Sequence, residues 1–138
     1  MMVKHSFTKQ ERLCSLSAIE WLFDGKGRAF NAHPLRIVYK AQTEEDESTV
    51  HLPQILISVS KKKFHNAVDR NRTKRLIREA YRLEKAPLAA FCEENKGCRL
   101  TVALIFIGNA LPSFEEIRQA LRSSLARIVK SLQHENAL

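Results

Sequence analysis

The chain has 138 residues, of which 44% are hydrophobic and 28% charged, and this length and composition are typical of one globular domain. We expect residues 1–138 to form a single unit. No apolar stretch approaches the roughly 20 residues of a membrane-spanning helix, and residues 1–10 contain no apolar signal core. Three cysteines are too few for a disulfide framework. A soluble, cytoplasmic protein without a membrane partner is therefore expected.

The positive charge is concentrated in one segment. Residues 58–85 contain ten basic and three acidic side chains. The rest of the chain contains 13 basic and 12 acidic side chains and is nearly balanced. A focused excess of this kind indicates a face that binds a polyanion, because a charge that served only solubility would be spread over the surface.

The first half of the chain predicts one helix and two strands. Apolar residues at helical spacing predict a short helix over residues 15–23. Residues 35–41 and 55–60 are rich in Ile, Val and Tyr and predict two strands. Because an acidic, polar loop joins them, we expect these strands to be neighbours in the sheet.

The second half predicts two long helices around a central strand. Asn66 followed by Asp69 indicates a helix start, and this helix runs to about residue 83, with a helical extension over 87–94. Residues 99–107 are apolar enough for a central strand, which a strand–helix–strand order makes parallel to its predecessor. Ser113 and Glu116 form a capping box for a closing helix. The predicted order is α-β-β-α-β-α, an α+β fold.

A helical wheel of residues 70–85 separates an apolar face from a basic one. The apolar arc, predicted to face the sheet, contains Thr73, Leu76, Ile77, Ala80 and Leu83. The opposite arc contains Asn71, Lys74, Arg75, Arg78, Arg82 and Lys85. Like charges three and four positions apart repel, so local stability does not explain this arc. Contacts with successive phosphates of a nucleic acid do explain it.

Two stretches around this helix resemble a known family. Residues 57–62 (ISVSKK) and 66–82 (NAVDRNRTKRLIREAYR) closely resemble the signature of the bacterial ribonuclease P protein subunit. The resemblance implies a two-layer α-β-β-α-β-α sandwich with a left-handed βαβ crossover, similar to domain 2 of ribosomal protein S5. It also implies a long basic helix that contacts the catalytic RNA, and a cleft between sheet and first helix that takes the 5′ leader of precursor tRNA.

Carried over by position, the resemblance assigns two groups of residues. The contacts with the RNA subunit are expected at Arg70, Asn71, Arg72, Lys74, Arg75, Arg78 and Arg82. The leader-binding cleft is expected at Ile19, Phe23, Tyr39, Ser58, Lys61, Lys62 and Lys63. In the cleft, aromatic or apolar side chains can stack on an unpaired base, and the lysines would hold the leader backbone.

Motifs for protein-based catalysis are not apparent. The sequence has no Gly-rich phosphate loop, nucleophile elbow or zinc-ligand spacing, so we expect no catalytic side chain and no organic cofactor. The resemblance implies an endoribonuclease that works as a ribonucleoprotein, with Mg²⁺ held mainly by the RNA subunit. The expected partners are the ribonuclease P RNA and precursor tRNA, and not DNA.

Three other functions remain as alternatives at this point. A general RNA-binding or ribosome-associated protein would carry the same basic helix but would have no processing role. A protein-only nuclease would use its own carboxylates. A helix-turn-helix DNA-binding protein is disfavoured, because a strand precedes the basic helix where that motif needs a short helix and a tight turn.

Overall fold

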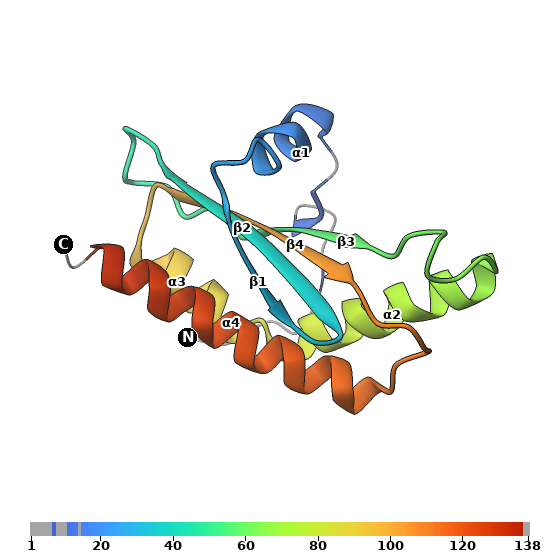
Figure 1. Ribbon diagram of the computed structural model, residues 1–138. Coiled ribbons are helices and arrows are strands. Elements are labelled where there is room, and N and C mark those ends of the chain that lie inside the picture. Colours follow the sequence, from blue (N-terminus) through green and yellow to red (C-terminus); the bar gives the residue numbers. More distant parts are fainter. Residues whose placement is uncertain (1–6, 8–10, 14, 137–138) are drawn as a thin grey trace.

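The computed structural model describes residues 7, 11–13 and 15–136. These residues form four helices and four strands (Figure 1). In chain order they are α1 (Leu16–Leu22), β1 (Arg28–Ala32), β2 (Leu35–Thr43), β3 (Gln54–Ser58), α2 (Ala67–Glu84), α3 (Ala86–Glu94), β4 (Cys98–Phe106) and α4 (Phe114–Asn136). The mixed α+β class predicted from the sequence is confirmed.

The sheet has the strand order β1-β2-β4-β3. β3 and β4 are parallel, as predicted, while β1–β2 and β2–β4 are antiparallel. The prediction that the second and third of these strands are neighbours is wrong, because β4 lies between them. β4 takes the central place because it is apolar on both faces: most of its residues are buried.

One further strand, β1, escaped the sequence prediction. It has only five residues and is partly exposed along its length, so it lacks the apolar run of a buried strand. It pairs with β2 from Arg28 opposite Tyr39 to Ala32 opposite Leu35. β1 therefore forms an edge of the sheet next to β2.

The helices lie on both faces of the sheet (Figure 1). On one face, α2, α3 and α4 enclose the main core, where Ile37 and Leu104 from the strands join Ile77 and Ile117 from the helices. On the other face α1 covers a smaller cluster formed by Leu13, Leu22 and Ala103. The sheet thus offers a face that α1 covers only in part.

Both predicted helix starts are confirmed by side-chain caps. Asn66 Oδ1 accepts a hydrogen bond of 2.9 Å from the amide of Val68 at the start of α2. Ser113 Oγ accepts one of 3.1 Å from the amide of Glu116 before α4. These caps satisfy amides that a helix leaves unpaired at its N-terminus. Among the described residues, no helix is long and apolar enough to cross a membrane.

Candidate nucleic-acid interface

Helix α2 has a buried face and an exposed basic face, as the helical wheel predicts. Thr73, Ile77 and Ala80 are fully buried toward the sheet and α4. Leu76 and Leu83, which the wheel placed on the same arc, are half-buried. Packing of the apolar face fixes the helix, so the side chains on its opposite side project from a rigid element.

Four basic side chains of α2 have no partner among the residues that the structure describes. Arg72, Arg75 and Arg78 are exposed and Lys74 is half-buried, and none of the four forms an ion pair or hydrogen bond in this part of the chain. We call these four residues the cationic face of α2. Asn71 is exposed beside them. Each charge is therefore available to an external anion.

Two other arginines of the predicted RNA contact have partners within the protein. Arg70 Nη1 donates to the backbone carbonyls of Phe64 and His65, each at 2.9 Å, and so holds the turn before α2. Arg82 Nη2 forms an ion pair of 2.5 Å with Glu79 Oε1, and its hydrogen bonds lower the pKa of Glu79. Their roles toward RNA stay predictions, and Arg82 would act with part of its charge neutralised.

The last residue of the predicted basic arc does not belong to it. Lys85 is buried, and its Nζ forms an ion pair of 3.0 Å with Glu11. The wheel assumed that the helix continues through this position. Because α2 ends at Glu84 and the chain turns directly into α3, Lys85 leaves the arc and points into the protein.

On the opposite face of the sheet, α1 places two residues of the predicted cleft. Ile19 is half-buried and, like Val38 and Ile105, packs against the small cluster. Phe23 is the C-cap of α1 and is 45% exposed. A ring exposed to this extent can stack on a base without prior rearrangement.

Tyr39 does not line this face, and its prediction as a cleft residue is wrong. Its side chain is buried in the main core, and its hydroxyl donates to Ser131 Oγ of α4 at 3.1 Å. Successive residues of a strand point to opposite faces, so Val38 and Lys40 face α1 while Tyr39 faces α4. The alternation of Leu35, Ile37 and Tyr39 with more polar residues was the available signal for this.

The turn after β3 carries the predicted lysines. Lys61 and Lys62 are exposed. Lys63 Nζ donates to the carbonyl of Ile107 at 3.2 Å and to Asn109 Oδ1 at 3.3 Å, so it joins this turn to the loop after β4. Ser58, at the end of β3, is half-buried.

Arg36 is a residue of this face that the sequence reasoning missed. It is exposed, and it lies opposite Ile105, which in turn pairs with Ser58, so the three form one row across the sheet. Its Nη1 donates to Asn31 Oδ1 at 3.0 Å. The strand register places Arg36 in line with Ser58. This register cannot be predicted from the sequence.

Among the described residues, no group of three or more His, Cys, Asp or Glu gathers in a way that could hold a metal ion. The polar groups that do gather on both faces are cations, hydroxyls and amides. These are groups that contact phosphates and base edges.

Comparisons with known proteins agree with this geometry. The model of the family described as Ribonuclease P matches residues 7–129. The ribonuclease P protein component of Porphyromonas gingivalis is 41% identical over 121 residues, covering 88% of this chain and 85% of the relative. That of Chlorobium phaeobacteroides is 35% identical over 124 residues, covering 86% of this chain and 81% of the relative.

Solved structures show the same fold. The RNase P protein of Staphylococcus aureus has a TM-score of 0.59 at 21% identity, covering 88% of this chain and 97% of that one. The RNase P protein of Thermotoga maritima has a TM-score of 0.56 at 23% identity, covering 85% of this chain and 96% of that one. With a family match that covers the whole sheet, helices α1–α3 and most of α4, the chain belongs to the ribonuclease P protein family.

Proposed function

We propose that the cationic face of α2 binds the catalytic RNA of ribonuclease P, while the α1 side of the sheet holds the 5′ leader of precursor tRNA. Membership of the family makes the chain a protein component of this ribonucleoprotein endoribonuclease, which matures the 5′ end of tRNA. One observation supports the RNA contact above all others. Arg72, Lys74, Arg75 and Arg78 lie along one side of a packed helix, and no described residue pairs with them.

The physical basis of the contact with the catalytic RNA is charge and shape. A helix rises about 1.5 Å per residue, so the cationic face is about 9 Å long and its side chains can reach neighbouring phosphates of a folded RNA. Arginine adds a planar fork that binds two phosphate oxygens at once. Because α2 is already fixed by its buried face, little conformational entropy is lost when the RNA binds.

The leader contact uses the opposite face of the sheet. Ile19 and Phe23 from α1 offer an apolar and an aromatic surface for unpaired bases. Lys61 and Lys62 extend from the turn after β3 and can contact the leader phosphates, with Ser58 at the start of that turn. The two RNAs would thus bind to different sides of one small protein.

In this proposal the Mg²⁺ ions are held by RNA. The described side chains form no group of three or more His, Cys, Asp or Glu that could hold a divalent cation, and no step is assigned to a protein-bound metal. What the chain contributes is binding: its cations reduce the repulsion between RNA phosphates, and its two faces bring the leader and the catalytic RNA together.

The test is reconstitution of precursor tRNA cleavage with the ribonuclease P RNA at low Mg²⁺ concentration. The wild-type chain should restore cleavage. A double Arg75→Ala, Arg78→Ala variant should lose assembly with the RNA while it keeps its circular dichroism spectrum. The matched control is Lys96→Ala with Lys130→Ala, which removes the same charge from two exposed positions outside both faces and should assemble normally.

Three results would contradict the proposal. Cleavage by the chain without the RNA subunit would make it a protein nuclease. Binding of RNA without restored cleavage would make it a general RNA-binding or ribosome-associated protein. An equal loss of assembly in the control pair would show that total charge, and not the cationic face of α2, determines binding.

A further inference from the structure

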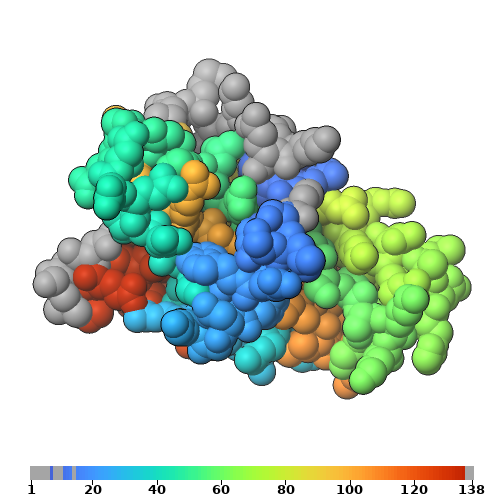
Figure 2. Space-filling view, turned by 90° about the horizontal axis from the view of Figure 1, so that it is seen from above, coloured from blue at the N-terminus to red at the C-terminus, as the bar shows by residue number. Residues whose placement is uncertain are grey.

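Helix α1 divides the face of the sheet on which it lies into two flanks. Figure 2 shows β4, in orange, on both sides of α1, in blue. The flank proposed for the leader leads to Ser58 and Lys61. The other flank leads to the loop between β2 and β3, and it contains a separate cavity of about 460 Å³.

This cavity, which we call the second groove, lies between α1 and the β2–β3 loop. Its walls are formed by Trp21 of α1 and Leu52 of the loop, and its floor is formed by Gln42, Gln54, Arg99 and Thr101 of the sheet. Gln42 lies opposite Arg99, and Gln54 lies opposite Thr101. Three adjacent strands therefore present polar side chains to the same space.

The polar groups of the floor are unused within the protein. Thr101 is only 6% exposed, and its hydroxyl has no hydrogen-bond partner in residues 11–13 and 15–136. The side-chain amides of Gln42 and Gln54 also have none within these described ranges. The Thr101 oxygen is not one of the buried, unpaired side-chain atoms of the described residues, so it is open to the cavity and, with the two amides, can bond a ligand there.

The planar groups around the floor are held in place. Lys40 Nζ lies 4.2 Å from the centre of the Trp21 ring, donates to the Trp21 carbonyl at 3.0 Å and pairs with Asp24 at 2.6 Å. These contacts fix the indole at the edge of the groove. An aromatic ring that is already ordered loses little entropy when another ring stacks on it.

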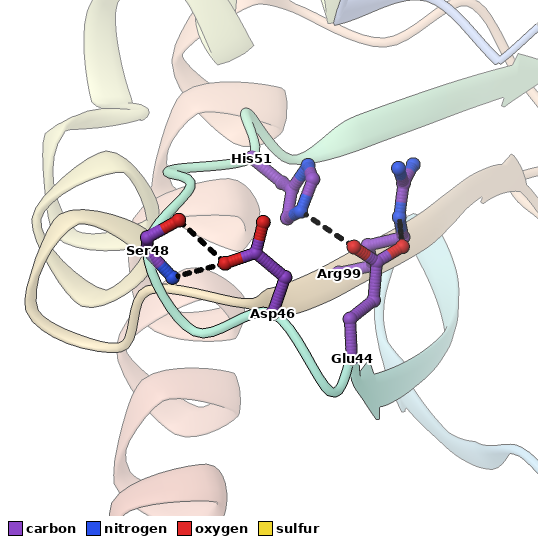
Figure 3. Close-up of polar contacts among 5 residues, drawn as sticks. All are labelled: Glu44, Asp46, Ser48, His51 and Arg99. Carbon is purple, nitrogen blue, oxygen red and sulfur yellow. Dashed lines mark hydrogen bonds and ion pairs between the residues drawn. The ribbon is translucent and has the colours of Figure 1, made fainter.

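At the far end of the second groove, Glu44 holds Arg99 and His51 (Figure 3). Glu44 pairs with Arg99 and lies 3.0 Å from His51 Nε2. The hydrogen bond from Arg99 is the main cause that lowers the pKa of Glu44. The charge of the ionised carboxylate is therefore balanced by Arg99, whose guanidinium is held at the floor beside Gln42.

We propose that the second groove binds an unpaired nucleobase of single-stranded RNA. A base is planar and can stack on Trp21 or Arg99, and its edge carries donors and acceptors that match two amides and a hydroxyl. The volume lies in the range of small-ligand sites, about 300–1,000 Å³. The inference goes beyond the proposed function, because it places a second base contact on the flank of α1 that faces away from Lys61 and Lys62.

The chain offers its own probe for this site, because Trp21 is its only tryptophan. The experiment follows tryptophan fluorescence while an adenylate hexamer is added to the full chain, with an abasic hexamer of the same length as the reference. We expect saturable quenching by the adenylate hexamer and at least about tenfold weaker binding of the abasic one, since one tenfold step equals about 1.4 kcal/mol.

Variants of the floor separate this site from the other flank of α1. A Gln42→Ala, Gln54→Ala variant should bind the adenylate hexamer about tenfold more weakly and lose the preference over the abasic hexamer. The matched control, Lys130→Ala on α4, should change neither. An unchanged urea midpoint of each variant confirms that the fold is intact.

Two outcomes would overturn the inference. Equal binding of the adenylate and abasic hexamers would mean that no base is recognised. Unchanged quenching in the floor variant would mean that the signal at Trp21 arises elsewhere. Neither outcome affects the contact between the cationic face of α2 and the catalytic RNA, which the reconstitution assay tests separately.

Discussion

The junction of α2 and α3 shows how the fold accommodates a buried charge. Lys85 Nζ lies 3.0 Å from both carboxylate oxygens of Glu11, and both side chains are almost fully buried. Each charge has lost its hydration and depends on the other. The pair connects the segment before α1 to the end of α2.

Removing one member of this pair is predicted to lower the free energy of unfolding much more than replacing both. Lys85→Met should lower the free energy of unfolding by about 3–5 kcal/mol, because the Glu11 carboxylate stays buried without a partner. A Glu11→Leu, Lys85→Met double variant should recover at least half of that loss. Urea denaturation of the three proteins measures both values, and an additive double variant would contradict the prediction.

The two described cysteines are also predicted to be inert. Burial raises the pKa of the Cys92 thiol to about 12 and raises that of Cys98, so the reactive thiolate is scarce near neutral pH. Iodoacetamide should label both residues only in concentrated urea, as mass spectrometry of the peptides would show. Rapid labelling of Cys92 in the folded chain would indicate an opening of the core around α3.

The sequence predicted the positions of some of these residues and not of others. Three members of the cationic face of α2, Lys74, Arg75 and Arg78, were predicted from the helical wheel alone, because helix periodicity fixes which side is free. Arg72 was assigned only by the resemblance. The prediction for Lys85 was wrong because a helical wheel does not show that the helix ends at Glu84. The prediction for Tyr39 was wrong because it rested on the resemblance alone, whereas the alternation with Leu35 and Ile37 places its side chain in the main core.

At the element scale, α2 depends on its N-cap for the order of its first turn. Asn66→Ala should lower the free energy of unfolding by about 1 kcal/mol, because the amide of Val68 loses its acceptor. Asn66→Asp keeps an acceptor and should stay close to the wild type. Thermal denaturation distinguishes the two, and equal losses would show that the cap itself is not the cause.

An ion-pair cluster joins α2 to α4. Glu84 of α2 accepts hydrogen bonds from Arg118 Nε at 2.7 Å and from Arg122 Nη2 at 2.8 Å. The bond from Arg122 is the largest cause that lowers the pKa of Glu84 below its ordinary value of 4.5. The ionised form is therefore favoured in the folded chain, and its contribution to stability is present above that ordinary value.

The contribution of Glu84 should consequently be lost in acid. Glu84→Gln should lower the free energy of unfolding at neutral pH by about 1–2 kcal/mol. The difference from the wild type should shrink as the pH falls below 4.5 and through the lowered pKa of the folded state. Urea denaturation over this range measures it, with Glu94→Gln, an exposed residue of α3, as the control. A pH-independent difference would contradict the assignment.

The helices were easier to predict than the sheet. All predicted helices exist with bounds close to those expected, because caps and apolar periodicity are local signals. β1 was not predicted, and β2 and β3 were wrongly predicted to be neighbours, because strand order depends on contacts between distant residues. The second groove was missed for the same reason: its floor combines Gln42, Gln54 and Thr101 from three strands.

At the scale of the whole molecule, binding of the catalytic RNA is predicted to depend strongly on salt. If about six phosphates are neutralised, affinity should fall roughly 10³-fold between about 50 and 200 mM salt. The Arg75→Ala, Arg78→Ala variant should show a shallower slope of log affinity against log salt, by about 1.4–1.8 for two lost contacts. Filter binding with the isolated RNA measures the slopes, and parallel lines would contradict a role for these two guanidinium groups.

The central position of β4 has a consequence for how the chain is made. Apart from a single bridge between Ile55 and Arg12, β3 pairs, among the described residues, only with β4, and β4 ends only at Phe106. During synthesis from the N-terminus, the β1–β2 hairpin can form early, whereas α2 emerges before the strand that completes its platform. The face of α2 that we propose for RNA binding is thus completed late, after most of the polypeptide has left the ribosome.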